Sequence, residues 1–171
     1  YLKALKIQEE LNDVRIIPLT LTGIGNVYLT VKNSKKALEY FFNALKKFEV
    51  LHDESNMALC MYNIGSAYAE MHQDGPALEY RLKALELFER LDNKFGVMAV
   101  ANAVANVYLR SRSYMKSLEY LQKSYRISKE IGSREYEALA LQSMCDVYMC
   151  IARDDSSSIE RGNLIPGSSK E

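Results

Sequence analysis

The sequence repeats its pattern of residue types every 40 residues, and this repeat constrains the fold more than any other feature. Segment 24–40 reads IGNVYLTVKNSKKALEY, segment 64–80 reads IGSAYAEMHQDGPALEY, and segment 104–120 reads VANVYLRSRSYMKSLEY. A repeated unit of this length cannot bury its apolar face alone, so neighbouring copies must stack to form a continuous core. The chain is therefore expected to form a repeat array.

Each unit contains two helical patterns separated by a short polar break. The first pattern places two apolar residues, a small residue and a tyrosine at i, i+3, i+4 and i+7, which is one stripe of an α-helix. The small-residue column of this stripe holds Gly25, Gly65, Ala105 and Cys145, and its last column holds Tyr28, Tyr68, Tyr108 and Tyr148. The second pattern repeats small residues and tyrosines, at Ala37, Ala77 and Ser117 and at Tyr40, Tyr80 and Tyr120. Each unit is thus predicted to be a hairpin of two helices of roughly 16 to 18 residues.

Small residues mark the points where the two helices of a hairpin meet. Gly25, Gly65, Ala37 and Ala77 carry little or no side chain, so two helix backbones can approach closely beside them. Pro18 interrupts the pattern at a position where the next unit has Ala58. We expect it to kink the helix or to delay its start, because proline lacks the backbone N–H of a helix interior.

The order of apolar residue, glycine, tyrosine, alanine, aromatic residue and alanine resembles the tetratricopeptide repeat over about residues 1–150. The units are 40 rather than 34 residues long, and Glu49, Glu89 and Lys129 replace the proline that usually closes the second helix. This form is similar to units in spindle-orientation scaffolds, kinesin light chains and bacterial peptide-sensing regulators. The resemblance implies an all-α, right-handed superhelical solenoid of antiparallel helical hairpins. Arg81 stands where Phe41 and Leu121 supply bulk, and we expect its stem to pack while its charged head reaches water.

The repeat also predicts the domain boundaries. A half repeat occupies residues 1–12, full repeats occupy about 13–52, 53–92 and 93–132, and a capping helix occupies 133–150. Residues 151–171 are rich in serine, glycine and charged residues and lack the pattern, so they are predicted to be a flexible tail or linker.

Composition limits the partners. Lys and Arg number 22 and Asp and Glu number 22 without a block of either sign, so neither nucleic acid nor an anionic membrane is expected as the partner. No apolar run approaches the ~20 residues of a membrane span, and the start lacks the layout of a secretion signal. Cys60, Cys145 and Cys150 lack C-x-x-C spacing, so we expect reduced packing cysteines, no metal or cofactor, and a cytoplasmic location.

The resemblance also implies that the first helices line the concave face of the array. Side chains on the flank of each first helix would then form a groove for an extended peptide or a partner protein segment. Asparagine side chains offer two donors and an acceptor, which match the N–H and C=O groups of a peptide backbone. Leu29, Leu59 and Leu109 would add apolar contacts. The predicted peptide-binding residues are Thr22, Asn26, Tyr62, Ser66, Asn102, Asn106, Arg110, Gln142 and Asp146.

Three other interpretations remain open from the sequence. In the first interpretation, the predicted groove residues are only solvated polar residues on a helix face and bind nothing. The second is a structural array that forms a homo-oligomer and controls an attached effector domain. The third is an enzyme, which is not expected, because neither His52 nor His72 has a suitably spaced acidic or nucleophilic partner. A protein-interaction module that forms the regulatory or scaffolding part of a larger signalling protein is the leading interpretation.

Overall fold

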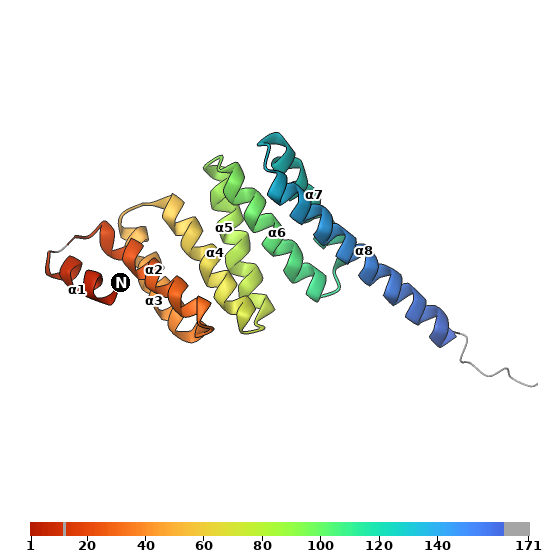
Figure 1. Cartoon of the computed structure of the whole chain (residues 1–171), viewed down its shortest axis with the longest axis horizontal. Helices are drawn as coiled ribbons and strands as arrows, with labels where there is room; N and C mark the ends of the chain where they lie inside the picture. Colours follow the sequence, from red (N-terminus) through yellow and green to blue (C-terminus); the bar gives the residue numbers. More distant parts are fainter. Residues whose placement is uncertain (12, 163–171) are drawn as a thin grey trace, which may run out of the picture.

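The computed structural model describes residues 1–11 and 13–162 of the chain as an array of antiparallel α-helix pairs. Successive hairpins stack side by side along the long axis of the molecule (Figure 1). The all-α solenoid predicted from the repeat is confirmed. The helices within the described residues are α1 (Leu2–Glu10), α2 (Ile16–Thr30), α3 (Ser34–Val50), α4 (Glu54–Glu70), α5 (Asp74–Arg90), α6 (Lys94–Arg110), α7 (Tyr114–Glu130) and α8 (Arg134–Gly162).

The turns divide the array into 20-residue half-units. From α3 to α7 every helix has 17 residues. A residue with positive φ follows each helix from α2 to α7, and these residues are Lys32, His52, His72, Asp92, Arg112 and Gly132. The left-handed conformation turns the chain at the helix C-terminus and lets the next backbone N–H groups bond to the last carbonyls. In the first such turn Lys32 N donates to Leu29 O at 2.9 Å and Asn33 N donates to Tyr28 O at 2.8 Å.

Polar residues at the helix starts fix the other side of these turns. The side chains of Asn33, Asp53 and Asn93 accept hydrogen bonds from the backbone N–H three residues later, at 3.3, 3.1 and 2.8 Å. Such caps satisfy one of the free N–H groups at a helix N-terminus and stabilise the helix by about 1 kcal/mol. The turn sequence therefore stops one helix and starts the next within three residues.

The first helices of the hairpins stack differently from the second helices. The inner helices, α2, α4, α6 and α8, contact one another in succession along the array. The outer helices, α3, α5 and α7, contact only inner helices within the described residues. Because the inner helices approach one another more closely, the array presents them on its concave side.

Small residues hold each hairpin together. Ala37, Ala44, Ala77 and Ala84 are fully buried. A Cβ atom added at Gly65 would lie 3.1 Å from the carbonyl oxygen of Ala77, so the glycine lets α4 and α5 approach backbone to backbone. Beside these contacts the two tyrosine columns stack within each hairpin, with ring centroids 5.4 to 5.9 Å apart, as Tyr28–Tyr40, Tyr68–Tyr80 and Tyr108–Tyr120.

Pro18 delays the start of its helix, which was one of its two predicted effects. Helix α2 begins at Ile16, whereas the corresponding helices α4, α6 and α8 begin at positions equivalent to residue 14. The proline ring then lies in the first helical turn, where a missing N–H breaks no helical hydrogen bond.

Helix α8 differs from the sequence prediction at its C-terminal end. It continues to Gly162 and extends past the rest of the array (Figure 1), which corrects the predicted boundary at residue 150. Between 151 and 161 the sequence has neither glycine nor proline to end the helix. Asp154 also holds the helix to the array, because it accepts hydrogen bonds from Arg112 at 3.1 Å and Tyr114 at 2.6 Å. The remainder of the predicted tail, residues 163–171, lies outside the described residues.

The sequence suggested that all three cysteines are packing residues, but the structure shows this only for Cys60. Cys60 is completely buried, and its thiol donates a hydrogen bond to the Phe41 carbonyl at 3.0 Å. Burial raises the pKa of this thiol to about 12. Cys145 is exposed on α8 and Cys150 is half-buried.

Replacing Gly132 by alanine should lower the free energy of unfolding by about 1 kcal/mol, because alanine is strained at positive φ. Nothing lies within 4 Å of an added Cβ, so the effect isolates the backbone conformation. The control is Gly75→Ala, in the first turn of α5, where the added Cβ also meets nothing and φ is not positive. This control should gain stability of up to about 1 kcal/mol. Urea unfolding followed by circular dichroism measures both, and equal effects of the two changes would contradict the turn assignment.

Thiol labelling should distinguish the buried and exposed cysteines. At pH 8 a thiol-reactive reagent should modify Cys145 of the folded protein quickly and leave Cys60 unmodified. A buried thiol with a raised pKa holds almost no thiolate, which is the reactive form. Cys60 should react only after denaturant is added. Mass spectrometry of digested, labelled protein reads out each site, and rapid labelling of Cys60 in native buffer would contradict the packing described here.

Candidate functional site

A groove of about 740 Å³ runs across the inner helices at the centre of the array. We call it the inner groove. Its lining comes from α2, α4, α6 and α8, from Lys32 in the turn between α2 and α3, and from one residue of the outer helix α5. The lining residues are Leu29, Thr30, Lys32, Tyr62, Ser66, Ala69, Glu70, Arg81, Ala99, Asn102, Ala103, Asn106, Leu109, Arg110, Tyr136 and Leu139.

The structure brings some of the predicted peptide-binding residues into this groove. Those that line it are Tyr62, Ser66, Asn102, Asn106 and Arg110. Leu29 and Leu109, expected to add apolar contacts, also line it. The groove therefore draws on the polar flanks of α4 and α6, as the repeat arrangement predicts.

The remaining four predicted residues lie elsewhere. Thr22 is buried, and its hydroxyl donates to the Pro18 carbonyl within the same helix at 2.9 Å, so it is corrected from a groove residue to a core residue. Asn26, Gln142 and Asp146 are exposed but do not line the inner groove.

Asn102 is the most deeply placed amide in the groove. Its side chain is 5% exposed, and its Oδ1 accepts a long hydrogen bond of 3.4 Å from Asn106 Nδ2. The Nδ2 atom of Asn102 is buried without a hydrogen-bond partner in the described chain. An unpaired buried donor costs about 1–3 kcal/mol, so in a folded protein such a group usually binds an ordered water molecule or a ligand.

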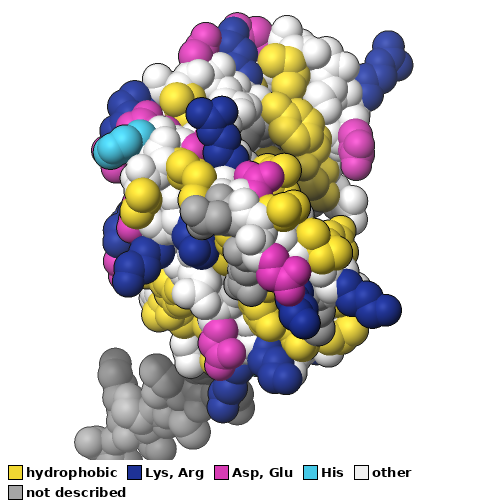
Figure 2. Space-filling view, turned by 90° about the vertical axis from the view of Figure 1, so that its left-hand side faces the viewer, with side chains coloured by type: hydrophobic (Ala, Val, Ile, Leu, Met, Phe, Trp, Pro, Cys, Tyr) yellow, Lys and Arg dark blue, Asp and Glu magenta, His cyan; other side chains and the backbone are white. Residues whose placement is uncertain are grey.

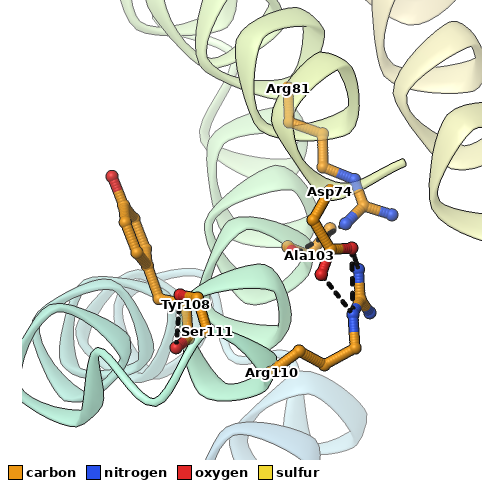
Figure 3. A network of polar contacts seen from close by, with 6 residues as sticks. All are labelled: Asp74, Arg81, Ala103, Tyr108, Arg110 and Ser111. Atoms are coloured by element: carbon orange, nitrogen blue, oxygen red, sulfur yellow. Dashed lines mark hydrogen bonds and ion pairs between the residues drawn. The ribbon is translucent and has the colours of Figure 1, made fainter. Parts of the chain in front are cut away.

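Arg81 lies beneath the groove, contrary to the expectation that its head reaches water. The residue is 7% exposed, and its guanidinium donates from Nη1 to the Ala103 carbonyl of α6 at 2.9 Å (Figure 3). Its Nε is buried and has no partner in the described chain. Burial lowers the pKa of the guanidinium, but arginine stays charged because its ordinary pKa is so high. The stem packs beside Gly65, where a Cβ would lie 2.8 Å from Arg81 Cγ.

Arg110 is held at the groove wall by Asp74. Its Nε donates to both carboxylate oxygens of Asp74, at 3.1 and 3.3 Å, and its Nη2 makes a further bond to the same group (Figure 3). Hydrogen bonds from Arg110 lower the pKa of the Asp74 carboxyl. The fork-shaped pairing fixes the arginine head in one position, and it leaves the Asp74 carboxylate engaged.

The charged groups around the groove are Lys32, Arg81 and Arg110 against Glu70 and Asp74. One positive charge is therefore in excess. Arg81 has no carboxylate within ion-pair distance in the described part of the chain, and Asp74, whose charge acts on Arg81, pairs with Arg110. Arg81 therefore brings a charge without an ionic partner in the described chain to the groove.

An apolar pocket of about 300 Å³ adjoins the inner groove and shares Tyr62, Ala99 and Tyr136 with it. Its walls include the exposed side chains of Leu59 and Phe95. The Phe95 and Tyr136 rings meet edge to face, with centroids 5.4 Å apart. A bound chain can therefore place a polar group over Arg81 and an apolar group beside these rings.

The outer side of the array has a second hollow of similar volume between α5 and α7. It is lined by charged residues such as Glu86, Glu89, Glu119 and Lys123, and Lys123 pairs with Glu89. No buried, unpaired donor of the described chain lies among its lining residues. The inner groove is the better candidate site for this reason.

The sequence analysis did not identify Arg81, Phe95 or Tyr136 as groove residues. Arg81 gave a usable signal, because it interrupts the apolar column of Phe41 and Leu121. Phe95 and Tyr136 gave none, because they lie outside the columns transferred from the repeat pattern.

Membrane-spanning helices and metal sites are both absent from the described residues. None of the helices in residues 1–11 and 13–162 is long and apolar enough to cross a membrane. Within the same residues, His, Cys, Asp and Glu side chains form no cluster of three or more able to hold a metal ion.

Comparison with known proteins identifies the repeat. Residues 16–90 match the family model described as Tetratricopeptide repeat. A search of curated proteins finds no match.

Several solved structures have a similar fold. A Rap protein complexed with Competence and Sporulation Factor matches 88% of this chain with a TM-score of 0.76 and 17% identity. A signal-transduction ATPase of the STAND type with a tetratricopeptide repeat sensor, from Pyrococcus horikoshii, matches 87% with a TM-score of 0.74 and 22% identity. BtubC from P. vanneervenii matches 99% with a TM-score of 0.71 and 18% identity. The chain spans 74% of BtubC, but only 45% of the Rap protein and 23% of the ATPase.

Replacing Arg81 by leucine should raise the free energy of unfolding by about 1–3 kcal/mol, because it removes a buried charge without an ionic partner. Leucine fills the same column in the next unit at Leu121, which is 1% exposed. The matched control is Leu121→Ala, which should lose about 2–5 kcal/mol by leaving a cavity. Urea unfolding measures both, and a loss of stability in Arg81→Leu would show that the arginine serves the fold.

Proposed function

Because the chain belongs to the tetratricopeptide repeat family, we propose that it binds an extended peptide or a partner protein segment in the inner groove. One observation carries the proposal: the groove contains a buried asparagine amide, Asn102 Nδ2, that no group of the described chain satisfies. A peptide carbonyl is an acceptor of the right kind for this donor. The groove volume of about 740 Å³ suits a few residues of an extended chain.

The amide pair explains how binding can tolerate different sequences. Asn102 and Asn106 lie one helical turn apart and are joined by the 3.4 Å contact between their side chains. Backbone N–H and C=O groups of a ligand are present whatever its side chains are, so amides placed one turn apart can hold a main chain. Tyr62 and Leu109 then supply apolar contacts on either side.

The similar structures support a regulatory setting for this binding. One is a Rap protein solved with Competence and Sporulation Factor, and another carries a tetratricopeptide repeat sensor within a signal-transduction ATPase. By analogy we propose that this chain is the regulatory or scaffolding part of a larger signalling protein. The proposal assigns it a binding role and no catalytic activity.

The double change Asn102→Ala/Asn106→Ala should weaken partner binding about 10-fold or more, since each lost hydrogen bond is worth about 0.5–1.5 kcal/mol. The matched control is Glu86→Ala/Gln122→Ala in the outer hollow, which removes two exposed polar side chains from the opposite side. Affinity capture from a native lysate, quantified by mass spectrometry, compares the three proteins. A partner that is captured equally by the Asn102→Ala/Asn106→Ala variant and the parent would contradict binding in the inner groove.

A second function, oligomerisation, is favoured by the apolar surface at the N-terminal end. Figure 2 views this end and shows hydrophobic side chains gathered on it between charged ones. The exposed apolar residues of α1, α2 and their connection are Tyr1, Ile7, Leu11, Val14, Ile16, Leu19 and Val27. A surface of this kind suits contact with a second copy of the array.

Light scattering at increasing protein concentration separates the two functions. Oligomerisation through the N-terminal end predicts a rising mass that Ile7→Glu/Leu19→Glu returns to that of a monomer, because these changes place charge on the exposed apolar surface. A monomer mass at every concentration would remove the second function and leave the first untouched.

A further inference from the structure

Each end of the array has a helix without the partner helix of its own hairpin (Figure 1). Helix α8 is an inner helix, and residues 151–162, where the other units turn into their second helix, continue α8 instead. Helix α1 takes the place of an outer helix, since Ala4 matches Ala44 at the 40-residue offset. Within the described residues α1 contacts only the next inner helix, α2. The two ends are therefore half hairpins of opposite kinds.

The side of α8 that corresponds to the hairpin contact is open. In α6 this side carries Ala101 and Ala105, which are fully buried, and the Ala105 carbonyl accepts a hydrogen bond from Ser117 of α7 at 2.9 Å. The same column of α8 holds Leu141, which is 45% exposed, and the exposed Cys145. This open surface, which we call the α8 face, comprises Arg134, Ala138, Leu141 and Cys145.

Helix α1 packs on α2 in the register of an outer helix. A Cβ atom added at Gly23 of α2 would lie 2.9 Å from the Tyr1 ring. In the central unit Arg81 of α5 contacts Ala103, which occupies the same column as Gly23, on the next inner helix. One side of α1 is thus used as in the other outer helices.

The other side of α1 is open in the same way as the α8 face. Phe41 and Ala44 are fully buried in α3. Their equivalents in α1 are Tyr1, which is 70% exposed, and Ala4, which is also exposed. This surface, which we call the α1 face, comprises Tyr1, Ala4 and Glu10.

The charges at the rims of these two faces are complementary. Within the array, Lys94 at the start of α6 forms an ion pair with Glu130 at the end of α7, and the α4–α5 hairpin has the equivalent pair with opposite polarity. The residue one repeat after Lys94 is Arg134, and the residue three repeats before Glu130 is Glu10. The open ends therefore carry the two halves of the same ion pair.

We infer that the α1 face of one copy packs on the α8 face of a second copy, so that the two half hairpins complete each other. The inference rests on the oligomerisation proposed as the second function and names its contact surface on each copy. Because the two surfaces differ, each copy keeps one of each kind free, and copies join head to tail.

The contacts inside the hairpins give the register of this interface. Phe41 lies against Gly25, and Ser124 donates to the Met98 carbonyl at 3.0 Å. At the repeat offset, the corresponding contacts between the copies are Tyr1 with Cys145, Ala4 with Ala138 and Glu10 with Arg134.

One pair of charges opposes this contact and gives a prediction of opposite sign. Lys123 pairs with Glu89 of the preceding outer helix, but the equivalent positions across the two copies hold Lys3 and Lys129. Both lysines are exposed, so water and salt screen their repulsion. Lys129→Glu should therefore tighten self-association about 2- to 5-fold.

The decisive test blocks the two faces one at a time in the whole chain. Leu141→Glu places a charge on the α8 face, and Ala4→Glu places one on the α1 face. Each variant alone should associate about 10-fold or more weakly than the parent, because the contact would bury a carboxylate. An equimolar mixture should form a dimer, since each variant supplies the face that is blocked in the other. Sedimentation velocity measures the masses.

Two controls accompany this test. Both changed positions are exposed, so the variants should fold, and circular dichroism verifies it. Met115→Glu replaces a side chain of α7 that is 77% exposed and belongs to neither face, so it should associate like the parent.

The negative results have different meanings. Association that persists in Leu141→Glu would indicate contact between two N-terminal ends, and association that persists in Ala4→Glu would indicate contact between two α8 faces. Either result would overturn the head-to-tail contact and leave oligomerisation in place, as would a monomeric mixture of the two variants when the parent associates. A parent that stays monomeric at every concentration would remove oligomerisation and this inference with it.

Discussion

The close approach of the two helices in each hairpin is the constraint on which the rest of the structure depends. Gly65 brings α4 within contact of the Ala77 backbone on α5, and stacked tyrosines close the same hairpin beside it. Because each hairpin is narrow at this column, the hairpins can stack with their inner helices in contact and their outer helices apart. The concave face, and the groove on it, follow from that packing.

The same column connects the core to the candidate site. In the unit before and the unit after, an apolar side chain fills the space beside the small residue, but in the central unit Arg81 does so. Its stem satisfies the packing requirement, and its guanidinium carries a charge to the groove floor beside Asn102. A single exception to the repeat thus converts a packing position into a polar one. The buried charge therefore lies in the middle of the array, where α4 and α6 flank the groove.

Most of the fold was predictable from the sequence, because the repeat reports a packing pattern directly. The hairpins, the stacking of glycine and alanine columns and the delayed start at Pro18 follow from spacing and backbone chemistry. The conformation of the turns was harder to predict from the sequence, because Lys32, His52 and Arg112 adopt positive φ without being glycine. The site was predictable where it lies on the flanks of α4 and α6. Thr22 was misplaced because it is buried beside the Cys60 thiol of α4. Arg81 was missed as a site residue because periodicity cannot show whether a charged head turns inward or outward.

The proposed function requires that a bound segment acts on the groups buried under the inner groove. Nuclear magnetic resonance of the Arg81 Nε–H and Asn102 Nδ2 protons, with and without a saturating segment of the captured partner, tests this requirement most directly. Binding in the inner groove should shift both signals and slow their exchange with water in the complex, while the Gln122 side-chain amide on the outer side stays unchanged. Unchanged Arg81 and Asn102 signals in a saturated complex would contradict it.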